Sequence, residues 1–219
     1  MVDIVAIDGP AGSGKSTVAK LLAKRLGYIY IDTGAMYRAL TLKALRNKIE
    51  LKNESLLCEL ASQAKLDIVN DDNGDMRVLL DSEDVTSLIR TPELTSSVAF
   101  LAKTRGVRDK MKVNQQSIGE RGKCVFEGRD IGTEVFPKAR YKFYLDADPG
   151  ERIKRRHKEM VEKEFDVSIE AVARDVNTRD HKDMNREVAP LKRAENAIYI
   201  DTTNLTIDEV VEKLTGYIK

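Results

Sequence analysis

The chain has 219 residues, and its 37 Lys plus Arg against 36 Asp plus Glu give a formal net charge of +1. This balance excludes a protein that holds an extended polyanion through bulk neutralisation of phosphates, and 42% hydrophobic residues exclude disorder of the whole chain. Two cysteines and two histidines, without metal-ligand spacing, argue against a disulfide scaffold or a zinc site. Since no apolar run is long enough to span a membrane and no signal peptide is visible, we expect one cytoplasmic domain without membrane or nucleic-acid partners.

Predicted strands and helices alternate in the N-terminal part of the chain. An apolar run over residues 4–7 predicts a buried strand, and a glycine-rich turn follows it. Apolar residues at helical spacing predict a helix over 16–26, which Gly27 ends. A second strand over 28–31 and a helix over about 35–48 complete a β-α-β-α order. This order is typical of an α/β fold with a parallel sheet.

The middle of the chain departs from this order. A predicted helix over 56–65 is followed by two β-prone segments, 66–69 and 76–80. The residues between them, 71–75, contain an Asn-Gly pair, which favours a tight hairpin turn. An antiparallel hairpin inside a parallel α/β chain is best placed in an insertion that lies off the main sheet.

The C-terminal half returns to alternating elements. Asp148 is a good N-cap, and Pro149 suits the first position of the helix that follows. The expected elements are, in order, helices over 92–103 and 107–118, strands over 123–126 and 141–145, helices over 149–164 and 169–179, a strand over 197–200 and a helix over 206–218.

The strongest motif lies between the first strand and the first helix. Residues 9–16 read Gly-Pro-Ala-Gly-Ser-Gly-Lys-Ser and match G-x-x-x-x-G-K-[ST] in full. The glycines let backbone N–H groups face an anion, and the helix adds the positive end of its dipole. Lys15 is expected to reach the β- and γ-phosphates, and Ser16 to ligate Mg²⁺. The motif predicts a triphosphate site formed by Gly9, Pro10, Ala11, Gly12, Ser13, Gly14, Lys15, Ser16 and Thr17.

Two segments resemble GTPase motifs, but in the wrong order. Residues 47–50 read Asn-Lys-Ile-Glu, close to N-K-x-D, and residues 71–74 fit D-x-x-G. In a GTPase the D-x-x-G comes first, and here Glu replaces the final Asp of the other motif. The basic run 154–158 is flanked by Glu151, Glu159 and Glu162 and fits a solvated helix face. An NTP-dependent switch or a nucleic-acid-binding ATPase is therefore the weaker hypothesis.

Arginine-containing clusters point to a second anionic ligand. Residues 32–38 and 127–130 each follow a predicted strand, at the edge where open α/β sheets bind ligands. Arg179, Asp183 and Arg186 have spacings of four and three, so they share a face if that segment is helical. Guanidinium groups suit phosphate oxygens, so we expect a second phosphate-bearing ligand beside the first.

These segments together resemble a bacterial-type cytidylate (CMP) kinase, a P-loop nucleoside monophosphate (NMP) kinase. The resemblance covers essentially the whole chain and rests on residues 9–16, 32–38, 128–133 (Gly-Arg-Asp-Ile-Gly-Thr) and 179–191. It implies a single kinase domain with a five-stranded parallel sheet flanked by helices, a small antiparallel β element and a helical lid. The implied boundaries are a core of 1–35, 85–148 and 190–219, an NMP-binding region of about 36–84 with a hairpin over 66–81, and a lid of about 149–175.

The same resemblance implies an activity and residue roles. The enzyme would transfer the γ-phosphoryl group of ATP to CMP or dCMP, with Mg²⁺, and we expect a monomer. Arginines would hold the acceptor phosphate, Arg108 with Asp130 would read the base, and lid arginines would close over the triphosphate. The implied catalytic residues are Lys15, Arg129, Arg155, Arg156 and Arg179. The implied substrate-binding residues are Thr33, Tyr37, Arg38, Arg108, Arg129, Asp130, Arg179, Asp183 and Arg186.

Two positions depart from the family pattern. Glu127 stands where the family usually has Asp, and this carboxylate would serve Mg²⁺ through water. A serine that often touches the base falls at Ala99, unless the match shifts to Ser96 or Ser97. A kinase for another monophosphate, UMP or AMP, stays open at this point.

Overall fold

The main sheet has five parallel strands in the order β2-β6-β1-β7-β8. The computed structural model describes residues 3–71 and 75–218. β1 and β6 are buried along their whole length, which explains why they are apolar on both faces. The strands are β1 (Ile4–Asp8), β2 (Ile29–Asp32), β6 (Cys124–Gly128), β7 (Tyr141–Asp146) and β8 (Ile198–Asp201). The predicted parallel sheet is confirmed.

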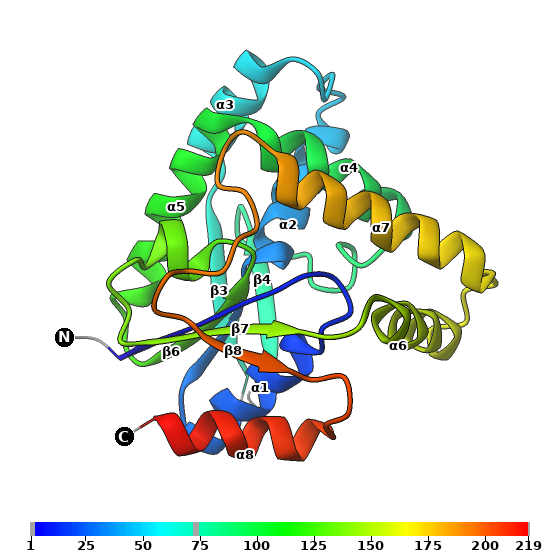
Figure 1. Cartoon of the computed structure of the whole chain (residues 1–219). Helices are drawn as coiled ribbons and strands as arrows, with labels where there is room; N and C mark the ends of the chain where they lie inside the picture. Colours follow the sequence, from blue (N-terminus) through cyan, green and yellow to red (C-terminus); the bar gives the residue numbers. More distant parts are fainter. Residues whose placement is uncertain (1–2, 72–74, 219) are drawn as a thin grey trace.

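Helices cover both faces of this sheet. Below it in Figure 1, α1 and α8 pack together, and above it lie α2, α4 and α5. α6 and α7 pack against each other at one side of the molecule. The helices are α1 (Lys15–Leu26), α2 (Thr33–Arg46), α3 (Glu54–Gln63), α4 (Pro92–Lys103), α5 (Arg105–Gly119), α6 (Pro149–Glu162), α7 (Ile169–Asn185) and α8 (Ile207–Tyr217).

A second, antiparallel sheet lies off the main one, as predicted. It has the order β3-β4-β5, formed by Leu66–Asn70, Met76–Leu80 and Glu83–Asp84. The third strand was not expected. Residues 72–74 of the predicted Asn-Gly turn lie outside the described residues. The buried side chains of Ile68 and Val78 join the same hydrophobic core as the main sheet.

Some predicted boundaries were wrong. α2 begins at Thr33 because the Asp32 carboxylate accepts the backbone N–H of Ala35 at 3.0 Å and so caps the helix. α7 extends to Asn185 instead of ending near Arg179. A short π-helix, η1 (Ile131–Val135), was missed entirely.

The described part of the chain, 3–71 and 75–218, holds no helix whose length and apolar character would let it cross a bilayer.

Candidate active site

The loop between β1 and α1 has the shape that phosphate binding requires. Gly12 and Gly14 have φ of 76° and 84°, in the left-handed region that favours glycine. A Cβ at Gly9 would lie 2.0 Å from the carbonyl oxygen of Leu145, so any residue other than glycine would clash with the backbone of Leu145. α1 begins at Lys15, which places a helix N-terminus at the end of the loop.

Lys15 is held inside this loop in an unfavourable electrostatic position. Its side chain is buried, and its Nζ donates a hydrogen bond to the carbonyl of Pro10 at 3.0 Å. Burial first, and then the charge of Arg129, lower the pKa of Lys15 to about 7. Arg179 acts in the same direction. An anion bound here would relieve the repulsion among these three cations.

Oxygen donors gather on the other side of the loop. The strand register pairs Asp32 with Glu127 at the carboxyl ends of β2 and β6. Glu127 is buried and receives hydrogen bonds from Ser16 and from the Tyr30 hydroxyl. Burial first, and then the Asp32 carboxylate, raise the pKa of Glu127. In the described residues no group of three or more His, Cys, Asp or Glu side chains could hold a metal ion. One hydroxyl and two carboxylates fit Mg²⁺, because this ion usually keeps several water ligands and takes its other ligands from a few protein oxygens and from substrate phosphates.

Four of the predicted substrate arginines each lie beside a carboxylate. Arg38 contacts Asp32 at 2.8 Å, and Arg129 Nε contacts Asp183 at 2.8 Å. Arg108 is ion-paired with Asp130. Arg186 lies 3.7 Å from Asp130 and 3.8 Å from Asp183. The loop after β6, α5 and the end of α7 thus bring Arg129, Arg108 and Arg186 into one ion-paired cluster, whereas Arg38 on α2 pairs with Asp32 at the end of β2.

Arg186 retains unused capacity for a ligand. Its side chain is 8% exposed, and its Nη2 is buried without a hydrogen-bond partner. Burial first, and then the charge of Arg108, lower its pKa. A buried guanidinium with a free donor is costly unless an acceptor is supplied, and a phosphate oxygen is a suitable acceptor.

A cavity lies beside this cluster. Arg108 stacks over the ring of Tyr37, with 5.6 Å from its Cζ to the ring centroid. Burial raises the pKa of Tyr37 to about 12, so this hydroxyl keeps its proton. The cavity is lined by Tyr37, Arg108, Asp109, Lys112, Gln115, Asp130, Glu134, Val135, Val188 and Ala189.

The family model for cytidylate kinase matches residues 5–219. The chain belongs to the cytidylate kinase family. Proteins named cytidylate kinase from Bacillus thuringiensis (strain Al Hakam) and Bacillus cereus (strain AH187) are each 47% identical to it over 214 residues, which cover 98% of this chain and 95% of theirs.

Solved structures share the fold at low sequence identity. An uncharacterized protein from Eubacterium ventriosum ATCC 27560 has a TM-score of 0.53 and 14% identity, covering 100% of this chain and 98% of that one. TT1252 from Thermus thermophilus has a TM-score of 0.50 and 19% identity, with the same coverage. These likenesses concern the fold alone.

Three residues that the cytidylate kinase resemblance named have other partners here. The Thr33 hydroxyl donates to the carbonyl of Glu127 at 2.8 Å and so links the start of α2 to β6. Arg155 donates to Thr202 Oγ1 at 3.0 Å and to the Thr202 carbonyl at 2.8 Å, next to the phosphate loop. Arg156 contacts Glu159 at 2.8 Å and lines a separate cavity between α6 and α7. The two lid arginines therefore face different surroundings.

Several residues of this region were missed by sequence reasoning. Gln115 lines the cavity near Tyr37, and its spacing of seven from Arg108 in one helix could have revealed it. Asp8 accepts the backbone N–H groups of Ile131 at 2.8 Å and Gly132 at 2.7 Å, and burial raises its pKa to about 7. No local pattern indicates that contact, because it joins residues far apart in the sequence.

Proposed function

We propose that the protein transfers the γ-phosphoryl group of ATP to CMP or dCMP, and that it releases ADP and CDP or dCDP. The observation that carries this proposal is the ion-paired cluster of Arg129, Asp183 and Arg186, which lies so close to Lys15 that Arg129 adds to burial in lowering the pKa of Lys15. Two anions fit there, one on the loop and one on the arginines. The family membership makes ATP and CMP the anions to test first.

The reaction needs positioning and charge stabilisation more than covalent help from the protein. An oxygen of the acceptor phosphate attacks the γ-phosphorus, and the bond from that phosphorus to the β–γ bridging oxygen breaks. Lys15 and the backbone N–H groups of the loop stabilise charge on the transferring group. Arg38, Arg129 and Arg186 hold the acceptor phosphate in line. No covalent intermediate and no single essential general base are required.

Mg²⁺ fits the oxygen donors described above. Ser16 would ligate the ion directly and Glu127 would act through a bound water, as the hydrogen bond between these two side chains supports. When bound, the ion offsets the negative charge of the donor phosphates. The buried ring of Tyr30 helps to keep water out of the floor of this site.

Recognition of the base falls to Arg108 and Asp130. Cytosine presents an N4 amino donor beside N3 and O2 acceptors, so it needs one acceptor and one donor from the protein. The ion pair of Arg108 and Asp130, at the edge of the cavity, supplies both. Arg179 and Asp183 would contact the ribose. If the family's serine falls at Ala99, and not at Ser96 or Ser97, the base contacts are left to Arg108 and Asp130.

We further propose that residues 36–84 form the NMP-binding region and that a lid covers the triphosphate over about 149–175, with Arg155 and Arg156 on it. Of these two, Arg155 already lies near Gly14, where the γ-phosphate is expected. A monomer contains every residue that the mechanism uses. The substrates and the reaction suit a cytoplasmic enzyme.

Product analysis tests this proposal against an ATPase or a switch. The protein is incubated with Mg²⁺, CMP and ATP labelled at the γ-phosphate, and the products are separated by chromatography. The expected result is label in CDP. Label that appears only as inorganic phosphate, at a rate independent of CMP, would show an ATPase instead.

A further inference from the structure

A buried ion pair joins the start of α6 to the middle of α7. Arg152 Nη1 donates a hydrogen bond to Asp180 Oδ2, and only 6% of Arg152 and 7% of Asp180 are exposed to solvent. Arg152 Nε also donates to the carbonyl of Ala147 at 3.1 Å and lies 3.8 Å from Asp146. The pair is therefore enclosed by protein groups on several sides.

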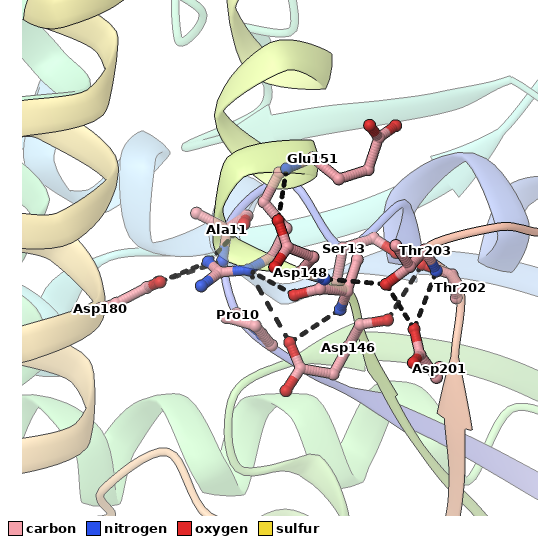
Figure 2. Close-up of polar contacts among 12 residues, drawn as sticks. Pro10, Ala11, Ser13, Asp146, Asp148, Glu151, Asp180, Asp201, Thr202 and Thr203 are labelled. Carbon is pink, nitrogen blue, oxygen red and sulfur yellow. Dashed lines mark hydrogen bonds and ion pairs between the residues drawn. The ribbon is translucent and has the colours of Figure 1, made fainter.

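The same pair forms hydrogen bonds with the backbone of one residue in the phosphate loop. Arg152 Nη1 donates to the carbonyl of Ala11 at 3.1 Å, while the N–H of Ala11 donates to Asp180 Oδ1 at 3.4 Å. Both polar backbone groups of Ala11 are thus satisfied by this one pair. Figure 2 shows Asp180 reaching from its helix toward the loop that carries Pro10 and Ala11.

The backbone of Arg152 also lies directly against the loop. A Cβ at Gly12 would lie 2.6 Å from the carbonyl oxygen of Arg152, so these two backbones pack as closely as glycine allows. A loop shape that gives up these contacts would leave the buried N–H and carbonyl of Ala11 without their hydrogen-bond partners, which is costly. The loop is therefore set by α6 and α7 as well as by its own glycines.

We propose that Arg152 and Asp180 are positioning residues that clamp Ala11 and so hold the phosphate loop in its nucleotide-binding shape. The proposal rests on the proposed function, because the nucleotide is ATP. Neither residue needs to touch ATP, since both act through the backbone of Ala11. Their loss should weaken ATP binding while the CMP side of the site, built on Arg38, Arg129 and Arg186, stays in place.

Two variants test the clamp, so that the test does not fail if one of them does not fold. Arg152→Lys keeps a buried positive charge, but its ammonium ends one bond short of the position of Nη1, from which Arg152 contacts both Asp180 and the Ala11 carbonyl, and it lacks the Nε donor to Ala147. Arg152→Met combined with Asp180→Leu removes both charges, which is commonly tolerated when a buried pair is replaced by apolar side chains. Lys158→Met, on the exposed face of α6 in a 3.9 Å pair with Glu162, is the matched control.

For both test variants we expect the KM for ATP to rise about tenfold and the KM for CMP to change by less than about twofold. The backbone N–H groups of residues 9 and 11–14 should exchange hydrogen faster than in the control, measured without nucleotide. Wild-type KM for ATP together with unchanged exchange in the double variant would overturn the clamp. A wild-type protein that forms no CDP would refute the proposed function instead, and the exchange data would still decide on the clamp.

Discussion

The Tyr30 hydroxyl donates a hydrogen bond to Glu127 Oε1 at 2.7 Å, beneath the phosphate loop. This contact gives the longer Glu side chain a fixed position where the family usually has Asp. The carboxylate also receives a hydrogen bond from Ser16. The Glu127 carboxylate lies one methylene farther from the backbone than an Asp carboxylate would, and these two hydrogen bonds hold it there.

This arrangement predicts how metal dependence responds to mutation. In Glu127→Gln the side chain keeps its size but loses the charge that would orient the waters of Mg²⁺. The Mg²⁺ concentration for half-maximal activity should rise about tenfold, because a charge-assisted hydrogen bond becomes a neutral one. Tyr30→Phe should shift it in the same direction by less. A Mg²⁺ titration of activity checks both, and superimposable curves for Glu127→Gln and wild type would remove Glu127 from the metal site.

Arg129 should matter for catalysis far more than for stability. Arg129→Ala removes the 2.8 Å contact with Asp183 and one donor to the acceptor phosphate, while Arg186 remains 3.8 Å from the same carboxylate. We expect kcat/KM for CMP to fall at least about a hundredfold with a normal circular dichroism spectrum. Arg25→Ala, at an exposed position in the last turn of α1, serves as the control. Wild-type turnover by Arg129→Ala would exclude the assigned role.

Base selectivity should depend on the charge of Asp130. Asp130→Asn replaces one acceptor oxygen by an amino donor, which suits the O4 acceptor of uracil better than the N4 amine of cytosine. The ratio of kcat/KM for CMP to that for UMP should fall about tenfold. Steady-state kinetics with both substrates measures this ratio. If it stays constant while both rates fall equally, Asp130 supports the arginines and does not read the base.

ATP binding should be linked to proton uptake. Burial and Arg129 hold the pKa of Lys15 at about 7, so free enzyme at pH 8 carries this side chain mostly neutral. Phosphates would raise that pKa toward its ordinary value, so binding above pH 7 should take up a proton and weaken as the pH rises. Calorimetry at pH 8 in buffers of different ionisation enthalpy detects the uptake. The arginine in Lys15→Arg stays charged at pH 8, so this variant should take up fewer protons when ATP binds. Equal proton uptake by the variant and the wild type would show that a group other than Lys15 takes up the proton.

Much of the fold follows from local patterns. The phosphate loop could be predicted because its motif is contiguous and lies between a buried apolar run and an amphipathic segment. The parallel sheet followed from strands that are apolar on both faces. The length of α7 could not be predicted, since it contains many charged residues and its C-terminal part is held by tertiary contacts such as the Arg152–Asp180 pair.

The parts of the site that were missed depend on long-range contacts. Asp8 orders η1 through the N–H groups of Ile131 and Gly132, which lie more than a hundred positions away in the sequence. Arg155 itself was named from the sequence, but its hydrogen bond to Thr202, 47 positions away, was not predicted. Contacts of this kind can be recognised only once the fold is known, because no residue spacing within a single helix or strand indicates them.

The identity of the preferred acceptor tests base recognition by Arg108 and Asp130 most directly. Initial rates of ADP formation, measured with ATP, Mg²⁺ and in turn CMP, dCMP, UMP and AMP, give kcat/KM for each acceptor under the same conditions. The predicted result is a kcat/KM for CMP or dCMP at least about tenfold above those for UMP and AMP. A preference for AMP would contradict base recognition by Arg108 and Asp130 and with it the proposed function.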